Sequence, residues 1–231
     1  MTSVAVIGAG AWGTVLANIL AKNGHDVTLW CYQQRIADNI CERRHHRLPG
    51  IELSATIRAT TTMADCYAHD LVILGLSSAQ LVMHQDMIQW AKIQCPILYI
   101  AKGVIEPKWF ISEWLSERFS GDIGVISGPN LAIEVAAQKP AASVVAATSA
   151  HVATMAQQLL SNFFFRVYTS NDMLGVQCGG IFKNVLAIAP PIATALNCLI
   201  RLFNNLIFVD ILEPPMMAIL GFFALFKKEF I

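Results

Sequence analysis

Charged residues are scarce in this chain, and neither sign is in excess. Only 14% of the 231 residues are charged, with 16 Lys and Arg balancing 16 Asp and Glu. A chain with no basic surplus is not expected to bind nucleic acid, and no run of Lys or Arg suggests a membrane-surface patch. The hydrophobic share is 55%, which is typical of a chain that buries a large core.

Cysteines are few and scattered, without a C-x-x-C pair among the six. This usage predicts reduced, mostly buried thiols in a cytoplasmic protein. The nearest approach to a metal-binding pair is His45-His46. Neighbouring side chains on a polar segment are expected to point apart, so the sequence predicts no metal site.

Long apolar runs are also missing. The run Met216–Phe226 has only 11 residues, and charged and polar residues between Arg201 and Asp210 interrupt the longer one, so no membrane span is expected. The first ten residues lack the charged and apolar regions of a signal peptide, and are instead expected to start a strand.

Apolar runs and helical patterns alternate along the first three quarters of the chain. Buried-type runs predict strands at residues 3–8, 26–32, 70–76, 96–103 and 122–130. Helical periodicity predicts helices at 11–24, 35–44, 79–92, 109–119 and 131–137, with Ser77-Ser78 capping the third. Such alternation predicts an α/β fold, a doubly wound, Rossmann-type parallel sheet over residues 1–170. A new helix is expected near Asn171, opening a second, truncated helical unit at 171–231.

The sequence Gly8-Ala9-Gly10-Ala11-Trp12-Gly13 follows the first strand and opens the first helix. That context is the one a dinucleotide-binding fingerprint requires. Gly8 allows the tight turn, Gly10 the approach of a pyrophosphate, and Gly13 the close packing of helix on strand. The alternative is a glycine-rich turn with no ligand.

The acid that usually follows the second strand of this fingerprint is absent. A carboxylate at that place binds the ribose 2′-hydroxyl and repels a 2′-phosphate. Here the strand is followed by Tyr32, Gln33 and Gln34, and then by Arg35. We therefore expect NADP to be tolerated and even preferred.

Three later segments extend this interpretation. Lys102 lies at the end of a predicted strand, where open α/β sheets bind ligands. The segment SGPN, 127–130, ends another strand and opens a helix. In GGIFKN, Lys183 follows two glycines by one helical turn, which predicts a hollow for a ligand beside its ammonium. A lysine that simply extends into solvent is the alternative for Lys183.

Taken together, several segments resemble the bacterial NAD(P)-dependent glycerol-3-phosphate dehydrogenases. In chain order they are GAGAWGT, LPG at 48–50, AKG, SGPNLAIEVA, FRVYTSND and GVQCGGIFKNVLAIA. The resemblance runs from residue 3 to about Ala189. It implies a Rossmann domain followed by a helical substrate domain, in a family that reduces dihydroxyacetone phosphate to sn-glycerol 3-phosphate, a phospholipid precursor. Ketopantoate and 6-phosphogluconate reductases are weaker alternatives.

The resemblance also implies roles for individual residues. Lys183 would be the catalytic general acid and base, and would contact substrate. Lys102 would touch both NAD(P)H and substrate, while Gly128 and Asn130 line the substrate site. The dinucleotide contacts implied outside the glycines are Ala11, Trp12, Tyr32 and Ala132. The expected partners are this small-molecule substrate and a second copy in a homodimer.

After Ala189 the resemblance stops. The family continues with helices that carry an Asp and an Arg-Asn pair, whereas this chain has Pro-Pro at 190–191 and 214–215 and no Arg-Asn pair in its tail. The tail is expected to be an out-of-frame reading or a truncated product, with a diverged domain as the alternative. Two functions stay open on this evidence: the family's oxidoreductase activity, and a dinucleotide-binding remnant with little or no turnover.

Overall fold

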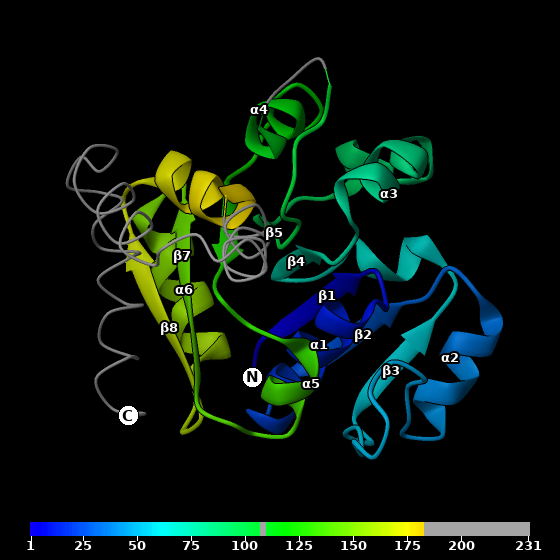
Figure 1. Cartoon of the computed structure of the whole chain (residues 1–231). Helices are drawn as coiled ribbons and strands as arrows, with labels where there is room; N and C mark the ends of the chain where they lie inside the picture. Colours follow the sequence, from blue (N-terminus) through cyan, green and yellow to red (C-terminus); the bar gives the residue numbers. More distant parts are fainter. Residues whose placement is uncertain (107–109, 183–231) are drawn as a thin grey trace, which may run out of the picture.

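A computed structural model describes residues 1–106 and 110–182 of the chain. Within them, one eight-stranded sheet forms the centre of the molecule (Figure 1). The strands are β1 (Ser3–Ile7), β2 (Asp26–Trp30), β3 (Ile57–Thr60), β4 (Leu71–Leu74), β5 (Ile97–Tyr99), β6 (Ile123–Ser127), β7 (Ala141–Ala147) and β8 (Phe165–Ser170).

The strand order is β3-β2-β1-β4-β5-β6-β7-β8. The first six strands of this order run parallel, and their arrangement is that of a doubly wound dinucleotide-binding sheet. β7 pairs antiparallel with β6 and parallel with β8. The predicted α/β fold with a Rossmann-type sheet is therefore confirmed, although the sheet contains one antiparallel pair.

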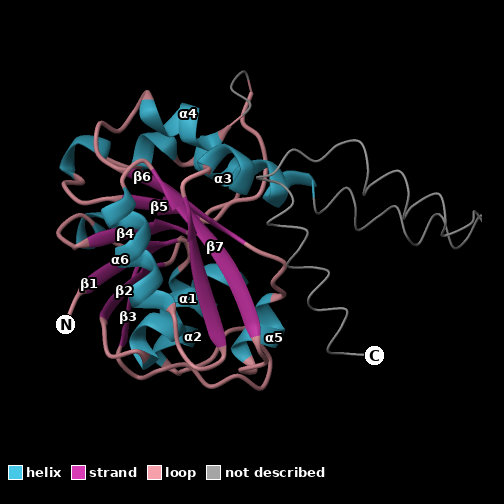
Figure 2. Cartoon of the chain, turned by 90° about the vertical axis from the view of Figure 1, so that its left-hand side faces the viewer, coloured by secondary structure: helices cyan, strands magenta, loops and turns pink. Residues whose placement is uncertain are grey.

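Helices cover both faces of the sheet (Figure 2). They are α1 (Ala11–Lys22), α2 (Gln34–Cys41), α3 (Ser78–Met83), α4 (Ile111–Ser116), α5 (Ala132–Ala136) and α6 (Ala150–Leu160). Because side chains alternate along a strand, β1 contributes Val4 and Val6 to one core and Ala5 and Ile7 to the other. The first core includes residues of α1, α2, α5 and α6, and the second includes residues of α3 and α4.

The predicted helix over 79–92 is wrong. Ser77 caps α3 as expected: its side chain accepts the Gln80 N–H, and the Gln80 side chain accepts the Ser77 N–H. The helix nevertheless ends at Met83. Two short 3-10 turns follow, η2 (Gln85–Met87) and η3 (Trp90–Lys92). A third, η1 (Met63–Cys66), precedes β4. After Met83, Ile88 and Ile93 are buried hydrophobic residues, and both belong to the second core.

Residues 173–182 form a helix directly after β8, close to the expected start near Asn171. Its Val176 is buried in the core that α4 also lines. Gln177 is 7% exposed, and its side-chain oxygen accepts hydrogen bonds from the Ser112 hydroxyl at 3.1 Å and the Ser112 N–H at 3.4 Å. These contacts fix the helix against α4. The division of the chain at residue 170 stays a prediction.

No helix among residues 1–106 and 110–182 is long and apolar enough to cross a membrane. The five cysteines that the structure describes are free thiols, with Cys31 and Cys66 buried and Cys41 exposed. Burial raises the pKa of Cys31 and of Cys66 to about 12, so both thiols stay protonated and unreactive.

Candidate functional site

The turn between β1 and α1 is built on glycines that no larger residue could replace without strain. Gly8 has φ +121°, a conformation that L side chains rarely adopt, and its N–H donates to the carbonyl of Trp30 at 3.2 Å. A Cβ on Gly13 would collide with the carbonyl oxygen of Gly8. A Cβ on Gly75, just after β4, would lie 2.7 Å from the same oxygen. Gly8, Gly13 and Gly75 thus let α1 pack directly over the ends of β1 and β4.

Gly10 has a different role. Its backbone is extended, at φ −71° and ψ 170°, and a Cβ there would meet only the Gly75 carbonyl oxygen, at 3.9 Å. Gly10 is also the N-cap of α1, where no side chain caps the helix and no acid occupies the first turn. The N–H groups of a helix N-terminus carry partial positive charge and bind phosphates. An uncapped helix end beside open space fits a dinucleotide pyrophosphate.

A histidine that the sequence did not suggest as a site residue supports this turn. His45 is 3% exposed, and its Nε2 lies 3.0 Å from the carbonyl oxygen of Ala9. Burial, the largest cause, lowers the pKa of His45 below its ordinary value. The expectation that His45 and His46 point apart is wrong, because their rings stack with centroids 4.7 Å apart. In the described part of the chain no three potential metal ligands gather.

The implied dinucleotide contacts outside the glycines come from the start of α1, the end of β2 and the start of α5. Ala11 and Trp12 begin α1, and the Trp12 ring meets Phe165 of β8 edge-on, with centroids 6.0 Å apart. Tyr32 follows β2, is 62% exposed, and lies 4.8 Å from the His84 ring between centroids. Ala132 is farther along the chain, at the first position of α5 and partly buried against the core.

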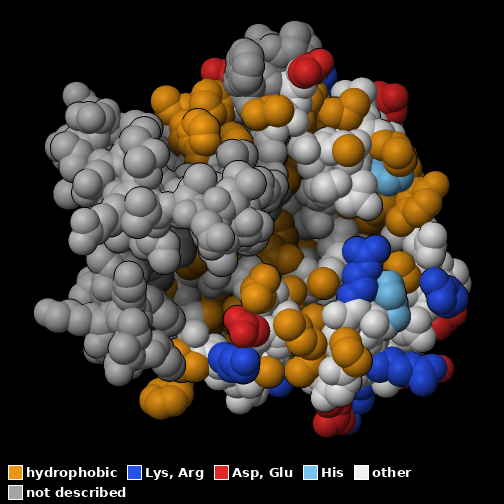
Figure 3. Space-filling model, in the orientation of Figure 1, with side chains coloured by type: hydrophobic (Ala, Val, Ile, Leu, Met, Phe, Trp, Pro, Cys, Tyr) orange, Lys and Arg blue, Asp and Glu red, His pale blue; other side chains and the backbone are white. Residues whose placement is uncertain are grey.

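Basic side chains gather over the α2 side of the molecule (blue in Figure 3). Four arginines lie in residues 35–47, namely Arg35, Arg43, Arg44 and Arg47. Two of them face acids, Arg43 bonding to Glu52 at 2.9 Å and Arg44 to Glu42. Arg35 lies in the first turn of α2, three residues after Tyr32, and is exposed. At this position the Arg35 guanidinium could contact the 2′-phosphate of a bound NADP.

A second group of predicted residues meets at the ends of β5 and β6. The Lys102 ammonium donates to the carbonyl of Gly128 at 3.0 Å. The side-chain amide of Asn130 donates to the Ser143 hydroxyl at 2.6 Å. A Cβ on Gly128 would lie 2.7 Å from the Ala142 carbonyl oxygen, so this position has no room for a side chain. The structure therefore brings Lys102, Gly128 and Asn130 together.

Helix 173–182 reaches this group through a glycine. A Cβ on Gly180 would lie 2.6 Å from the Ser127 hydroxyl and 3.7 Å from Cγ of Lys102. The space beside Gly180 is thus taken by Ser127. The predicted hollow beside the Lys183 ammonium stays a prediction, because Lys183 is outside the described residues. Lys183, the predicted catalytic residue, is outside the described residues, one position after the end of this helical stretch.

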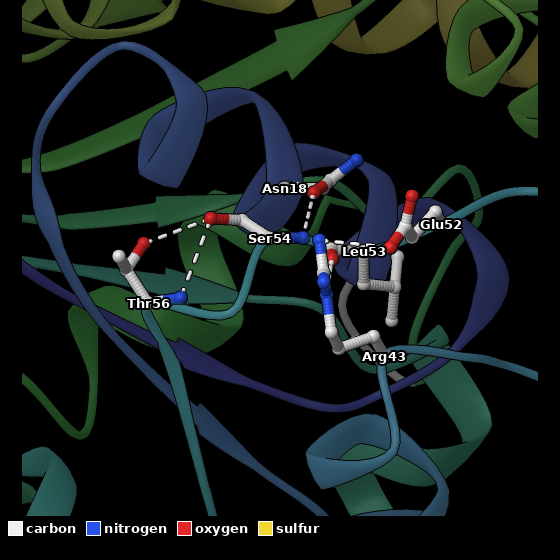
Figure 4. Close-up of polar contacts among 6 residues, drawn as sticks. All are labelled: Asn18, Arg43, Glu52, Leu53, Ser54 and Thr56. Atoms are coloured by element: carbon white, nitrogen blue, oxygen red, sulfur yellow. Dashed lines mark hydrogen bonds and ion pairs between the residues drawn. The ribbon is translucent and has the colours of Figure 1, made fainter.

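A cavity of about 360 Å³ lies elsewhere, around Lys22 at the far end of α1 from the glycine turn. The loop after α2 forms much of its wall (Figure 4). There the Arg43 Nε donates to the Leu53 carbonyl at 3.1 Å, and the buried Asn18 accepts the Ser54 N–H at 2.8 Å (Figure 4). These bonds shape the loop, and none of the predicted site residues lines this cavity.

Comparison with known proteins identifies the family. Residues 3–153 match the family model described as NAD-dependent glycerol-3-phosphate dehydrogenase N-terminus. The chain belongs to this family. The matched range contains the glycine turn, Tyr32, Lys102, Gly128, Asn130 and Ala132, and ends before helix 173–182.

Individual relatives agree with that membership. The chain is 36% identical over 203 residues to glycerol-3-phosphate dehydrogenase [NAD(P)+] of Citrifermentans bemidjiense, covering 84% of this chain and 61% of that protein. It is 38% identical over 199 residues to the enzyme of the same name from Corynebacterium aurimucosum, covering 82% and 59%. The crystal structure of glycerol-3-phosphate dehydrogenase from Coxiella burnetii superposes with a TM-score of 0.75 at 28% identity, covering 87% and 63%. The chain thus spans about three fifths of the length of the relatives it matches.

Proposed function

We propose that this chain binds NAD(P)H at the glycine turn. The observation that carries the proposal is the uncapped N-terminus of α1 at Gly10, where the direction of a Cβ is nearly free of neighbours and the first turn has no acid. Gly8 and Gly13 hold the helix in that place by packing without side chains. Ala11 and Trp12 lie at the helix start, so their backbone N–H groups are the ones available to the pyrophosphate.

We further propose that the reaction is the reduction of dihydroxyacetone phosphate to sn-glycerol 3-phosphate. Names of the matched relatives support the substrate, and the group around Lys102 supports the chemistry. Reduction of a ketone develops negative charge on its oxygen, which an ammonium stabilises. The bound nicotinamide would supply the hydride. We propose that Lys102, whose ammonium bonds to the Gly128 carbonyl, meets the substrate beside Asn130, and that Lys183 delivers the proton.

The missing acid after β2 supports a preference for NADPH. Tyr32 is exposed there, with Arg35 in the next helix. A 2′-phosphate at this position would meet a cation and no carboxylate from residues 31–35.

The remaining parts of the proposal concern the whole protein. We propose that the product serves phospholipid synthesis and that the protein acts in the cytoplasm, as the sequence resemblance and the scattered cysteines suggest. A homodimer and a division into a dinucleotide domain, residues 1–170, and a helical unit, 171–231, belong to the same proposal.

The test is oxidation of NADPH and NADH by purified protein with dihydroxyacetone phosphate, followed at 340 nm, with glycerone lacking the phosphate as control substrate. Oxidation that requires the phosphorylated ketone supports the full proposal. Tight dinucleotide binding without such oxidation would restrict the function to binding. No binding of either dinucleotide would overturn both parts.

A further inference from the structure

We propose that His45 is a positioning residue for the dinucleotide site, whose neutral imidazole, held by contacts at both ring nitrogens, keeps the glycine turn in its binding shape. This inference rests on the proposed dinucleotide function for its biological meaning. The structural claim, that His45 controls the glycine turn, concerns contacts within the chain itself.

Both ring nitrogens of His45 have defined partners, and these fix the tautomer. The backbone N–H of Arg47 points at Nδ1, at 3.2 Å, so Nδ1 accepts and carries no proton. Nε2 lies 3.0 Å from the Ala9 carbonyl, which can only accept, so Nε2 carries the proton and donates it. A neutral imidazole therefore satisfies both contacts at once.

The Ala9 carbonyl belongs to the peptide unit that leads into Gly10. A trans peptide is planar, with its C=O and N–H on opposite sides. Because His45 holds the Ala9 oxygen on its own side, the Gly10 N–H is kept facing away from His45. No side chain of the turn restrains this peptide, since Gly10 has none and α1 has no side-chain cap. His45 thus supplies from outside the restraint that the glycines themselves lack.

Protonation would leave Nε2–H as a donor to the Ala9 carbonyl but would break the bond to Arg47 that fixes the other side of the ring. A proton on Nδ1 would face the Arg47 N–H, so two donors would oppose each other where a hydrogen bond was. The ionisable groups that face His45 are His46, whose ring stacks on it, and Arg47. The turn over residues 8–13 contributes no ionisable side chain. Burial lowers the pKa of His45 most, and His46 and Arg47 lower it further, against the hydrogen bond to Ala9, which raises it; the net shift is downward, so the neutral form prevails at neutral pH. Acid should therefore reduce the protection of the turn against hydrogen exchange.

The experiment compares wild type with His45→Gln and His45→Phe, and with His46→Gln as the matched control. Gln can still donate to the Ala9 carbonyl but does not titrate, whereas Phe keeps the ring and removes both nitrogens. Hydrogen exchange of the peptide over residues 8–14 is measured without ligand at pH 7.5 and 5.5, corrected for intrinsic rates. The Gly8 and Thr14 N–H groups, which bond to Trp30 and Gly10, report on the turn. NAD⁺ affinity is measured by titration calorimetry, because its pyrophosphate does not titrate in this range.

We expect faster exchange in His45→Phe at both pH values and NAD⁺ binding about three- to tenfold weaker, the scale of one lost hydrogen bond. Wild type and His46→Gln should lose protection and affinity on acidification, where His45 takes up a proton, while His45→Gln should not. Thermal melting at pH 7.5 verifies that each variant is folded. A folded His45→Phe with wild-type exchange and affinity would overturn the inference, as would an acid response in His45→Gln equal to that of wild type. If wild type binds no NAD⁺ but its turn still depends on His45, the proposed function fails and the positioning role stands.

Discussion

The ammonium of Lys102 donates a hydrogen bond across 3.0 Å to the backbone carbonyl of Gly128. This contact joins the segment after β5 to the turn after β6, at the edge where strands of a doubly wound sheet present ligand sites. A ligand that approached this edge would find the lysine already held by the backbone, with Asn130 bonded to Ser143 beside it. Ordering these side chains before binding reduces the entropy lost on binding.

The glycines of the turn are expected to respond differently to substitution. Gly10→Val should abolish dinucleotide binding without unfolding the chain, because the backbone at Gly10 suits any residue and its Cβ direction is open. Gly8→Ala, in contrast, forces a side chain into φ +121° and 2.8 Å from the Gly75 carbonyl carbon, and should lower the free energy of unfolding by roughly 1–3 kcal/mol. Urea unfolding and NADPH titration of both variants measure the two effects. Gly10→Val protein that binds NADPH like wild type would refute the assignment of the turn.

NADPH should bind at least as tightly as NADH. Residues 31–34 after β2 carry no acid, and Arg35 follows in α2. Tyr32→Asp should place a carboxylate where the 2′-phosphate would lie and shift the preference toward NADH, while Tyr32→Asn, which adds no charge, should shift it less. Fluorescence titrations of both cofactors against the three proteins give the ratios. Tight NADH binding with negligible NADPH binding in wild type would contradict this expectation.

Sequence periodicity predicted the sheet well where strands are buried on both faces. Continuous apolar stretches that end in glycine or polar residues, and that alternate with helical patterns, predict buried strands. Such stretches cover β1, β2, β4, β5 and β6. β3, with Arg58 exposed between the buried Ile57 and the partly buried Ala59, carries a weak apolar pattern and was not predicted. β7, AASVVAA, is rich in alanine and lacks a strand-specific pattern, so its antiparallel pairing with β6 had no signal.

The glycine turn, Lys102 and the SGPN turn could be found from the sequence because each lies at a strand end with a recognisable local pattern. His45 and Ser143 could not, because their roles depend on contacts across 36 and 13 residues of chain. Gly75 had a usable signal, since it ends a buried run, but its purpose is clear only from its approach to the Gly8 carbonyl oxygen. Local pattern thus locates the backbone features of the site, and tertiary packing locates their supports.

Replacement of Lys102 should weaken substrate binding more than it weakens folding. Lys102→Met keeps the length of the side chain but removes the charge that would meet the substrate, as well as the bond to Gly128. A lost charge-assisted hydrogen bond corresponds to roughly a ten- to hundredfold rise in KM for dihydroxyacetone phosphate. Steady-state kinetics with the variant, and with Lys102→Arg as the charge-retaining control, measure the change. Equal KM values for wild type and Lys102→Met would remove Lys102 from the substrate site.

Lys183→Ala should lower turnover by about a hundredfold or more, the usual scale for losing a general acid. Dinucleotide affinity should be retained, because the glycine turn is built from residues far earlier in the chain. Lys92, an exposed lysine at the end of η3, provides the matched control in Lys92→Ala. Pre-steady-state kinetics with a deuterated nicotinamide separate the chemical step from binding. Unchanged turnover in Lys183→Ala would leave this residue as a lysine exposed to solvent, the alternative that the sequence had left open.

Acid should destabilise the fold through three histidines whose pKa is lowered by desolvation. The pKa values of His25, His45 and His69 are all lowered from 6.5, with desolvation as the largest cause in each. As pH falls below about 6.5 the unfolded chain takes up protons that these folded sites resist, so the unfolded state binds more protons and the free energy of unfolding declines. Above that pH both states are neutral at these sites and the contribution vanishes. The urea midpoint should therefore fall from pH 7.5 to 5.5.

The His69→Gln variant isolates one contribution to this acid effect. His69 lies 3.0 Å from the Thr28 hydroxyl, which also accepts a 2.7 Å bond from Arg58, so a charge on His69 would approach a guanidinium. Gln can preserve the contact with Thr28 and cannot be protonated, so its urea midpoint should fall less between pH 7.5 and 5.5 than that of wild type. Asp70, whose pKa is lowered mainly by the Ser3 N–H, titrates below this window and does not confuse the comparison. A wild-type midpoint that stays level or rises on acidification would show that these histidines are accessible to protons in the folded protein.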